Sequence, residues 1–336
     1  MSGQQKTFDN PQTKPSLYSL QPDALKSANN TKRRELAKDT KFKTLQRFQD
    51  EFPQDFAATQ AGTIGNPPRP PGGANPRPLV QYDASQPWIN VVPCDPLEAA
   101  HAMKLNGEGK VAVLNPTDPM NPNGWAFGQD SIEASFCHRS LLSLALKEEW
   151  YKPRFHPDKM ASTTRIRVFS LQAGVDNVLP HNEHFPVDFL SVSVPVKPEL
   201  TSVQIDGKTV QRYTQDSTAT IMRQKLEKVL KWASSSKATL VLCPFGCEEK
   251  FGHPARAVSE LIRDTLLGNG NHPPQIDWRS FGLRKVIIAV RDVGKKGHYD
   301  PSESLWKTFA EMFKNCPGVG VDFSNEWYLQ QICTPR

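Results

Sequence analysis

Short apolar runs alternate with longer amphipathic stretches from Trp88 to the end of the chain. Short apolar runs are typical of buried strands, and apolar positions three to four residues apart are typical of helices that pack on a sheet. The pattern predicts strands at 89–92, 111–115, 166–170, 189–196, 239–243 and 285–291, and helices at 96–103, 131–149, 217–234, 254–267 and 302–314. This alternation favours a sheet with helices on its faces.

Three of the predicted helices begin at residues that suit a helix start. Ser217 precedes an apolar stripe, Pro254 suits a first helical position, and Ser302 suits an N-cap.

The first 87 residues have a different texture. Residues 1–30 contain few apolar positions, so we expect a disordered tail. Residues 31–52 show a basic amphipathic helical pattern, which predicts a helical extension on the folded body. Residues 57–87 are rich in proline and glycine and predict a loop insertion without regular structure. The sequence therefore predicts one domain at 31–336, preceded by a tail.

The net charge of +6 comes mainly from the N-terminal arm. The chain has 41 Lys and Arg against 35 Asp and Glu, and the first fifty residues hold ten of the former and five of the latter. The remainder is therefore almost neutral, and any contact with nucleic acid is expected to be weak and to run through residues 31–50.

The composition also bears on where the protein works. No apolar run approaches the roughly 18 residues of a membrane span, and the N-terminus lacks the apolar core of a secretory signal. Six widely spread cysteines do not resemble a disulfide framework. We expect a cytoplasmic or nuclear protein with reduced thiols and no membrane partner.

Two glycine-bearing loops follow predicted strands and lead into predicted helices. The first runs from Asn115 to the helix that opens near Ser131, and the second spans 241–254 with Gly246 and Gly252. Ligands bind at the carboxyl ends of strands in such sheets, where free N–H groups at helix starts attract phosphate. Two loops of this kind favour a nucleotide-like ligand with a diphosphate.

Six blocks of the sequence, in order, resemble a known family. They are TKRRELAKDT at 31–40, CDPLEAA at 94–100, VAVLN at 111–115, NPNGWAFGQDSIEASFCHRS at 121–140, FPVDFLSVSVPV at 185–196 and LVLCPFGCEEKFGHPARAVSELI at 240–262. In spacing and texture they resemble the microbial-type poly(ADP-ribose) glycohydrolase domain, a branch of the macrodomains, over about residues 31–291. The resemblance implies a three-layer α/β/α fold with a mixed central sheet, and ADP-ribose or an ADP-ribosylated protein as partner. No cofactor is expected.

The resemblance also implies positions for the ligand. It places Asn115 and Asn121 on the ribose side and Gly246 and Cys247 in the second phosphate-facing loop. The first phosphate-facing loop would contain Gly124, Trp125 and Phe127, with an aromatic ring either covering the ribose or packing under the loop. Asp95 either contacts adenine or caps the helix that follows it.

The catalytic positions depart from the family pattern. A Gln-Glu-Glu sequence in the family becomes Ile132, Glu133 and Ala134 here, so the first acid is kept and the second is lost. Glycosidic cleavage needs a carboxylic acid to protonate the leaving oxygen, and Glu133 or Asp130 could take over only if the helix start is shifted. We therefore expect retained ADP-ribose binding with weakened or lost glycohydrolase activity. The alternative is a non-catalytic module that binds protein or RNA through its basic helix.

The second loop departs from the pattern as well. A Gly-Cys-Gly-x-Phe sequence becomes Gly246 and Cys247 followed by Glu248, Glu249 and Lys250. Either the two carboxylates point to solvent, or the pocket takes another ligand, because inward carboxylates repel a diphosphate. Cys243, Cys247 and His253 form only a partial metal set, so no metal is predicted.

Overall fold

A computed structural model describes part of the chain. The described residues are 46, 49, 50, 53, 63–65, 87–120, 131–151, 155, 157–171, 178–205, 207–269, 273–291, 304–322 and 324. The predicted tail lies outside them, as does nearly all of the predicted basic helix.

Eight strands of the described residues form one mixed sheet, in the order β1-β4-β5-β3-β8-β9-β2-β10. Their bounds are β1 Thr63–Gly65, β2 Ile89–Val92, β3 Val111–Thr117, β4 Met160–Val168, β5 Phe185–Ser193, β8 Thr239–Leu242, β9 Val286–Ala289 and β10 Val319–Val321. Neighbours from β5 to β10 pair in parallel, whereas β4 pairs antiparallel with β5 and β1 antiparallel with β4. The carboxyl ends of β5, β3 and β8 therefore meet at one edge.

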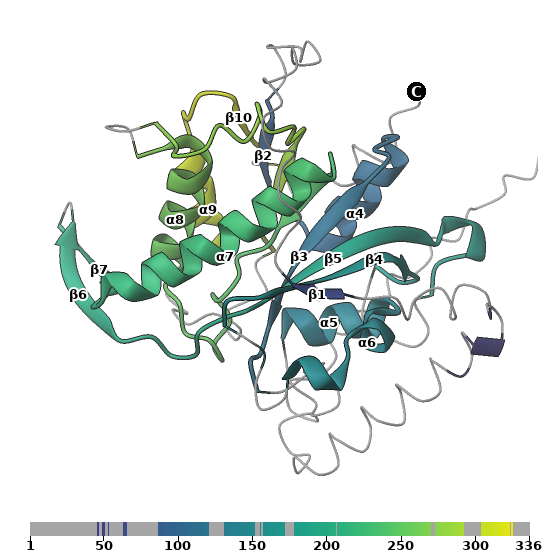
Figure 1. The fold of residues 1–336 in the computed structure, drawn as a ribbon. Helices are drawn as coiled ribbons and strands as arrows, with labels where there is room; N and C mark the ends of the chain where they lie inside the picture. Colours follow the sequence, from purple (N-terminus) through teal and green to yellow (C-terminus); the bar gives the residue numbers. More distant parts are fainter. Residues whose placement is uncertain are drawn as a thin grey trace, which may run out of the picture.

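Helices cover both faces of the sheet (Figure 1). One core contains α4 (Pro96–Leu105), α5 (Ile132–Arg139) and α6 (Leu142–Ala145), and the other contains α7 (Asp216–Ser235), α8 (Ala255–Leu267) and α9 (Leu305–Phe313). Alternate residues of β3 serve the two cores, because Val111 and Val113 pack on the α4 side while Ala112 and Leu114 pack on the α7 side. The predicted three-layer α/β/α fold is confirmed.

The buried elements agree best with the sequence prediction. Strand β2 has the predicted bounds, and β3, β8, β9, α4, α7 and α8 lie within two residues of theirs. The helix starts agree less well. Helix α7 begins at Asp216 without a side-chain cap, Pro254 occupies the N-cap position of α8, and Ser304 rather than Ser302 caps α9.

The single helix predicted at 131–149 is wrong. Ser140 has extended backbone angles, φ −150° and ψ 172°, and forms an isolated bridge with Val168 at the end of β4. The Leu141 N–H donates to the Arg167 carbonyl on the same strand. This pairing with β4 divides the segment into α5, α6 and the 3-10 turn η2 (Glu148–Tyr151).

Four strands escaped prediction. A separate two-stranded sheet is formed by β6 (Leu200–Ile205) and β7 (Lys208–Tyr213), whose strands are largely exposed. Strand β10 also lies outside the predicted set. Strand β1 lies inside the proline-rich segment, so the expectation that 57–87 lacks regular structure is wrong at 63–65.

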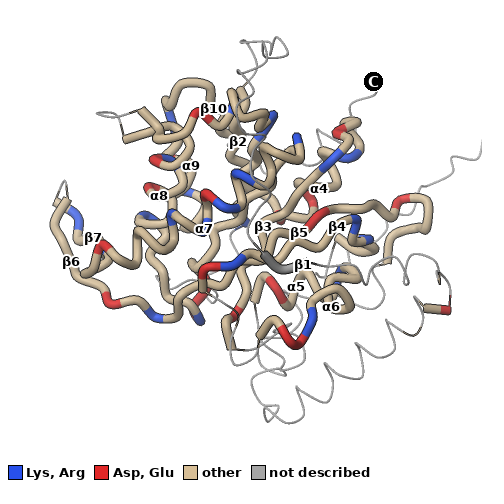
Figure 2. The backbone as a smooth tube through the Cα atoms, viewed as in Figure 1, with Lys and Arg blue, Asp and Glu red and all other residues tan. Residues whose placement is uncertain are grey.

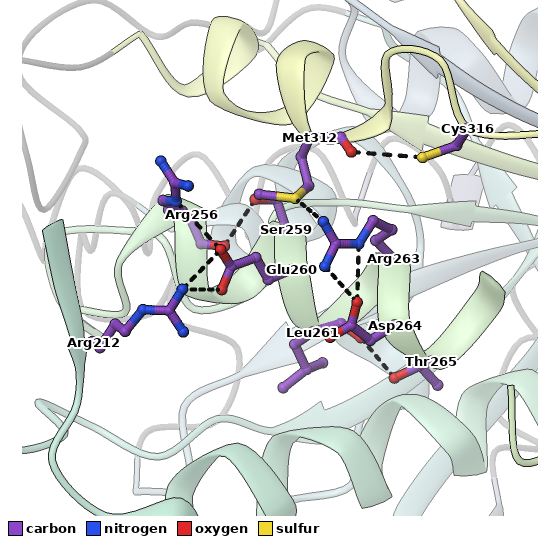
Figure 3. Close-up of polar contacts among 10 residues, drawn as sticks. All are labelled: Arg212, Arg256, Ser259, Glu260, Leu261, Arg263, Asp264, Thr265, Met312 and Cys316. Carbon is purple, nitrogen blue, oxygen red and sulfur yellow. Dashed lines mark hydrogen bonds and ion pairs between the residues drawn. The ribbon is translucent and has the colours of Figure 1, made fainter. Parts of the chain in front are cut away.

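Charges are interspersed over the described part of the chain (Figure 2). Figure 3 shows how several of them meet on α8. Arg212 of β7 and Arg256 both contact Glu260, while Arg263 pairs with Asp264 and reaches the Met312 sulfur of α9. We call Arg212, Arg256, Glu260, Arg263 and Asp264 the α8 ion-pair surface. Within the described ranges, no helix is long and apolar enough to span a membrane.

Candidate functional site

Polar side chains gather where β3 ends. Asn115 of β3 and Ser191 of β5 are paired in register, so their side chains share a face of the sheet, and the Asn115 Nδ2 donates to Ser191 Oγ over 2.9 Å. The same amide nitrogen lies 3.4 Å from Oε1 of Glu133, the second residue of α5. The structure thus brings together Asn115 and Glu133, two of the predicted site residues.

Glu133 is held among neutral donors. Its side chain is buried, with the residue 1% exposed, and Oε1 accepts hydrogen bonds from Thr117 Oγ1 at 2.5 Å and Tyr151 Oη at 3.0 Å. The two hydroxyls lie 2.9 Å apart. We call Asn115, Thr117, Glu133, Tyr151 and Ser191 the Glu133 cluster.

Burial governs the protonation of this cluster. Loss of hydration raises the pKa of Glu133 to about 7, although the hydrogen bonds from Thr117, Tyr151 and Asn115 favour the carboxylate. Burial also raises the pKa of Tyr151 well above its ordinary value, so its phenol keeps its proton. Glu133 is therefore poised to change charge near neutral pH.

Two buried oxygen atoms of the cluster have no hydrogen-bond partner among the described residues. They are Asn115 Oδ1 and Glu133 Oε2. Buried polar atoms are nearly always paired in folded proteins. An amide oxygen and a carboxyl oxygen side by side in one cluster can accept hydrogen bonds from the hydroxyl groups of a sugar.

The first turn of α5 carries one acid. Ser131 caps the helix, and its hydroxyl accepts the Ala134 N–H over 3.1 Å. Ala134 is buried and offers only a methyl group. Successive helix residues point about 100° apart, so the Glu133 carboxyl does not replace a side chain at position 134 unless the helix rotates.

Gly246 and His253 fix the shape of the second loop. Gly246 has φ 89°, and a Cβ there would lie 2.9 Å from the His253 ring. The Pro195 carbonyl lies 2.8 Å from Nε2 of His253, which must therefore donate, and Tyr213 Oη donates to Nδ1 over 2.8 Å. Burial lowers the pKa of His253 to about 4, so the ring is neutral at physiological pH.

Both cysteines of the partial metal set are buried thiols. Burial raises the pKa of Cys243 and of Cys247 above the ordinary value, and the Cys243 S–H donates to the Leu114 carbonyl. With both nitrogens of His253 engaged, the three residues do not form a ligand set. The ligand-binding role predicted for Gly246 and Cys247 stays a prediction.

The second loop contacts both ends of the first. Glu248 Oε1 accepts the N–H of Ile132, the first residue of α5. The Lys250 ammonium forms an ion pair with buried Asp118, just beyond the end of β3. Glu249 is exposed. Of the two carboxylates whose direction the sequence left open, Glu248 thus lies toward the site and Glu249 toward solvent.

Asp95 lies at the other end of α5. It caps α4, accepting the Leu97 N–H at 2.8 Å, and Glu98 completes a capping box. Its two oxygens also contact Arg139, the last residue of α5, at 2.8 and 3.1 Å. The structure thus shows the helix-cap role, and the adenine contact stays a prediction.

The remaining predicted site residues lie outside the described residues. They are Asn121, Gly124, Trp125, Phe127 and Asp130. In turn, the sequence prediction missed Thr117, Tyr151 and Ser191 of the Glu133 cluster. Thr117 and Ser191 carry a usable signal, because they are polar residues at or near the carboxyl ends of strands that are mainly apolar. Tyr151 carries none, since an aromatic residue in a mixed segment looks like any core residue.

Comparison with known proteins yields matches among solved structures. No family model matches the sequence, and no curated protein matches it. A glutamate-to-alanine mutant of poly(ADP-ribose) glycohydrolase from Thermomonospora curvata superposes with TM-score 0.58 at 21% identity, covering 84% of this chain and 100% of that one. The enzyme from Deinococcus radiodurans in complex with ADP-ribose superposes with TM-score 0.55 at 19% identity, covering 78% of this chain and 98% of that one. These likenesses confirm the predicted resemblance at the level of the fold.

Proposed function

We propose that this protein binds ADP-ribose, free or attached to a protein, at the carboxyl edge of β3, and that its poly(ADP-ribose) glycohydrolase activity is weakened or lost. Two observations support binding. The fold is shared with a glycohydrolase solved with ADP-ribose, and the Glu133 cluster leaves two buried acceptor atoms without partners among the described residues. Ribose hydroxyls are donors that suit both atoms.

The loss of hydrolysis rests on one observation, the buried alanine that follows Glu133. Cleavage of a ribosyl bond passes through an oxocarbenium-like state and needs one group to protonate the leaving oxygen and then to activate water. Removing such a group typically lowers the rate about 10²- to 10⁴-fold. Alanine supplies no proton.

Glu133 is the residue that would support any residual hydrolysis. A pKa of about 7 suits a general acid at neutral pH. Its Oε1 is nevertheless held by Thr117 and Tyr151 inside the cluster. We therefore assign Glu133 chiefly to orienting a ribose hydroxyl. Asp130, the weaker catalytic candidate, stays a prediction.

Binding is tested by calorimetry and thermal melting with ADP-ribose. We expect measurable heat and a raised melting temperature, because a ligand that binds only the folded state stabilises it. An absence of both at millimolar ADP-ribose would contradict the binding proposal.

Hydrolysis is tested by Ala134→Glu, with Ala134→Gln as a control of equal size. We expect the purified protein to release little ADP-ribose from poly(ADP-ribose), Ala134→Glu to release it at least about 100-fold faster, and Ala134→Gln to stay at background. Thermal melting verifies that both variants fold. Robust release by the unmodified protein would refute the loss of activity.

A further inference from the structure

Glu248 places a carboxylate where an anionic ligand would be expected to bind. Its Oε1 accepts the N–H of Ile132, the first residue of α5. The first N–H groups of a helix have no partner within the helix, and the helix dipole adds partial positive charge there. Phosphate groups use such N–H groups. A side chain of the second loop thus occupies one of them.

The contact has a second anchor in the same loop. The Lys250 ammonium pairs with Asp118, whose side chain is nearly buried. Lys250 is a cation that could favour a phosphate at this edge of the sheet, but the pair offsets its charge. Glu248 and Lys250 thus hold the second loop against Ile132 and Asp118 at the same time. We call these two contacts the loop clasp.

The clasp lies beside incompletely paired atoms. Glu133, the residue after Ile132, keeps its buried Oε2 without a partner among the described residues, as does Asn115 with its Oδ1. The position suited to an anion is therefore occupied from within, while neighbouring positions suited to sugar hydroxyls are not. An ordinary helix cap only completes local hydrogen bonding, whereas the Glu248 contact lies beside buried polar atoms that lack partners among the described residues.

We propose that Glu248 is an internal competitor for the phosphate of the ligand, and that the loop clasp must open before a phosphorylated ligand binds. The inference rests on the proposed function, since it concerns the same site. A ligand that must first displace an internal group binds more weakly than the open site allows. Glu248 thereby sets affinity and excludes weak anions.

The test is Glu248→Gln, with Glu249→Gln as the matched control. Both substitutions remove one negative charge from adjacent positions of the same loop and keep side-chain size, but only Glu248 contacts Ile132. Calorimetry at constant salt should show that Glu248→Gln binds ADP-ribose about tenfold more tightly than the unmodified protein. The affinity of Glu249→Gln should stay within about twofold of that of the unmodified protein. If Glu248→Gln folds poorly, Glu248→Ala serves in its place.

The outcomes separate the two proposals. If the unmodified protein binds ADP-ribose and the Glu248 and Glu249 variants do so equally, the competitor is refuted while the proposed function stands. If neither the unmodified protein nor a variant binds ADP-ribose, the proposed function fails. Binding of inorganic pyrophosphate then tests whether Glu248 is a competitor. Tighter pyrophosphate binding by Glu248→Gln than by Glu249→Gln supports the competitor, and equal or absent binding overturns it.

Discussion

The Glu133 cluster and the α8 ion-pair surface differ in the partners and the burial of their carboxylates. On α8, Glu260 meets two guanidinium groups, and the arginines remain partly exposed to water. In the cluster, Glu133 meets only neutral donors, is buried, and leaves one oxygen without a partner among the described residues. The partly exposed, paired carboxylate of Glu260 serves local order. A buried, incompletely paired one lowers stability and therefore marks a candidate site.

The Asp95–Arg139 pair stands between these extremes, since it is buried yet fully paired. Arg139 is 1% exposed and also donates to Ser135 and to the Leu171 carbonyl. It joins the start of α4 to the end of α5, so it holds in place the helix that carries Glu133. Glu260, Glu133 and Asp95 thus differ in burial and in pairing, so the effect of each property on stability can be compared within one molecule.

The largest effect is expected for Arg139→Met. This variant leaves Asp95 buried without its cation and should lower the free energy of unfolding by about 3–5 kcal/mol, measured by urea denaturation. Adding Asp95→Asn should recover part of the loss, because asparagine still caps α4 and carries no charge. A double variant no more stable than Arg139→Met would contradict this account.

Glu133→Gln should change how stability depends on pH. Because the folded state raises the pKa of Glu133 from 4.5 to about 7, it holds a proton that the unfolded chain releases between those values. Unfolding free energy therefore falls as pH rises through this window, by up to about 3 kcal/mol, and the variant lacks this component. Relative to the unmodified protein, Glu133→Gln should gain stability between pH 5 and pH 8 in urea denaturation. Parallel curves of unfolding free energy against pH for the two proteins would contradict the raised pKa of Glu133.

The smallest effect is expected for Glu260→Gln. Its arginine partners are about one third or more exposed, so the change should lower the free energy of unfolding by at most about 1 kcal/mol, and by less at high salt. The same urea denaturation, repeated at low and high salt, provides the measurement. A loss as large as that of Arg139→Met would erase the contrast between the two regions.

Much of the fold could be predicted because its central elements are largely buried. Strands β2, β3, β8 and β9 consist mainly of apolar residues, and α7 and α8 carry regular apolar stripes. The β6–β7 hairpin buries only Val210, and the other residues of its strands are half-buried or exposed, so no apolar run reveals it. The Asp206-Gly207 dipeptide between two alternating segments is a hairpin signal that was available. The break at Ser140 was not predictable locally, since pairing with β4 causes it.

The site was predictable only in part for a related reason. Asn115 and Glu133 could be named because the sequence around them resembles the microbial-type glycohydrolase family. Tyr151 reaches Glu133 from η2, after two helices, and no local pattern announces that contact. The direction of Glu248 depends on how the second loop packs against α5. The parts of the site that could not be predicted thus depend on contacts between segments distant in sequence.

The loop clasp also bears on how the length of the first loop can vary. Asp118 and Ile132 flank residues 119–131, and the second loop holds both positions. With the ends fixed, the entropy of closing the intervening chain grows only with the logarithm of its length, by about 0.6 kcal/mol for each doubling. Insertions or deletions between these anchors that keep Ser131, the cap of α5, therefore perturb the sheet and α5 little. The scaffold can accept new sequences there, and with them new ligand contacts, without being rebuilt.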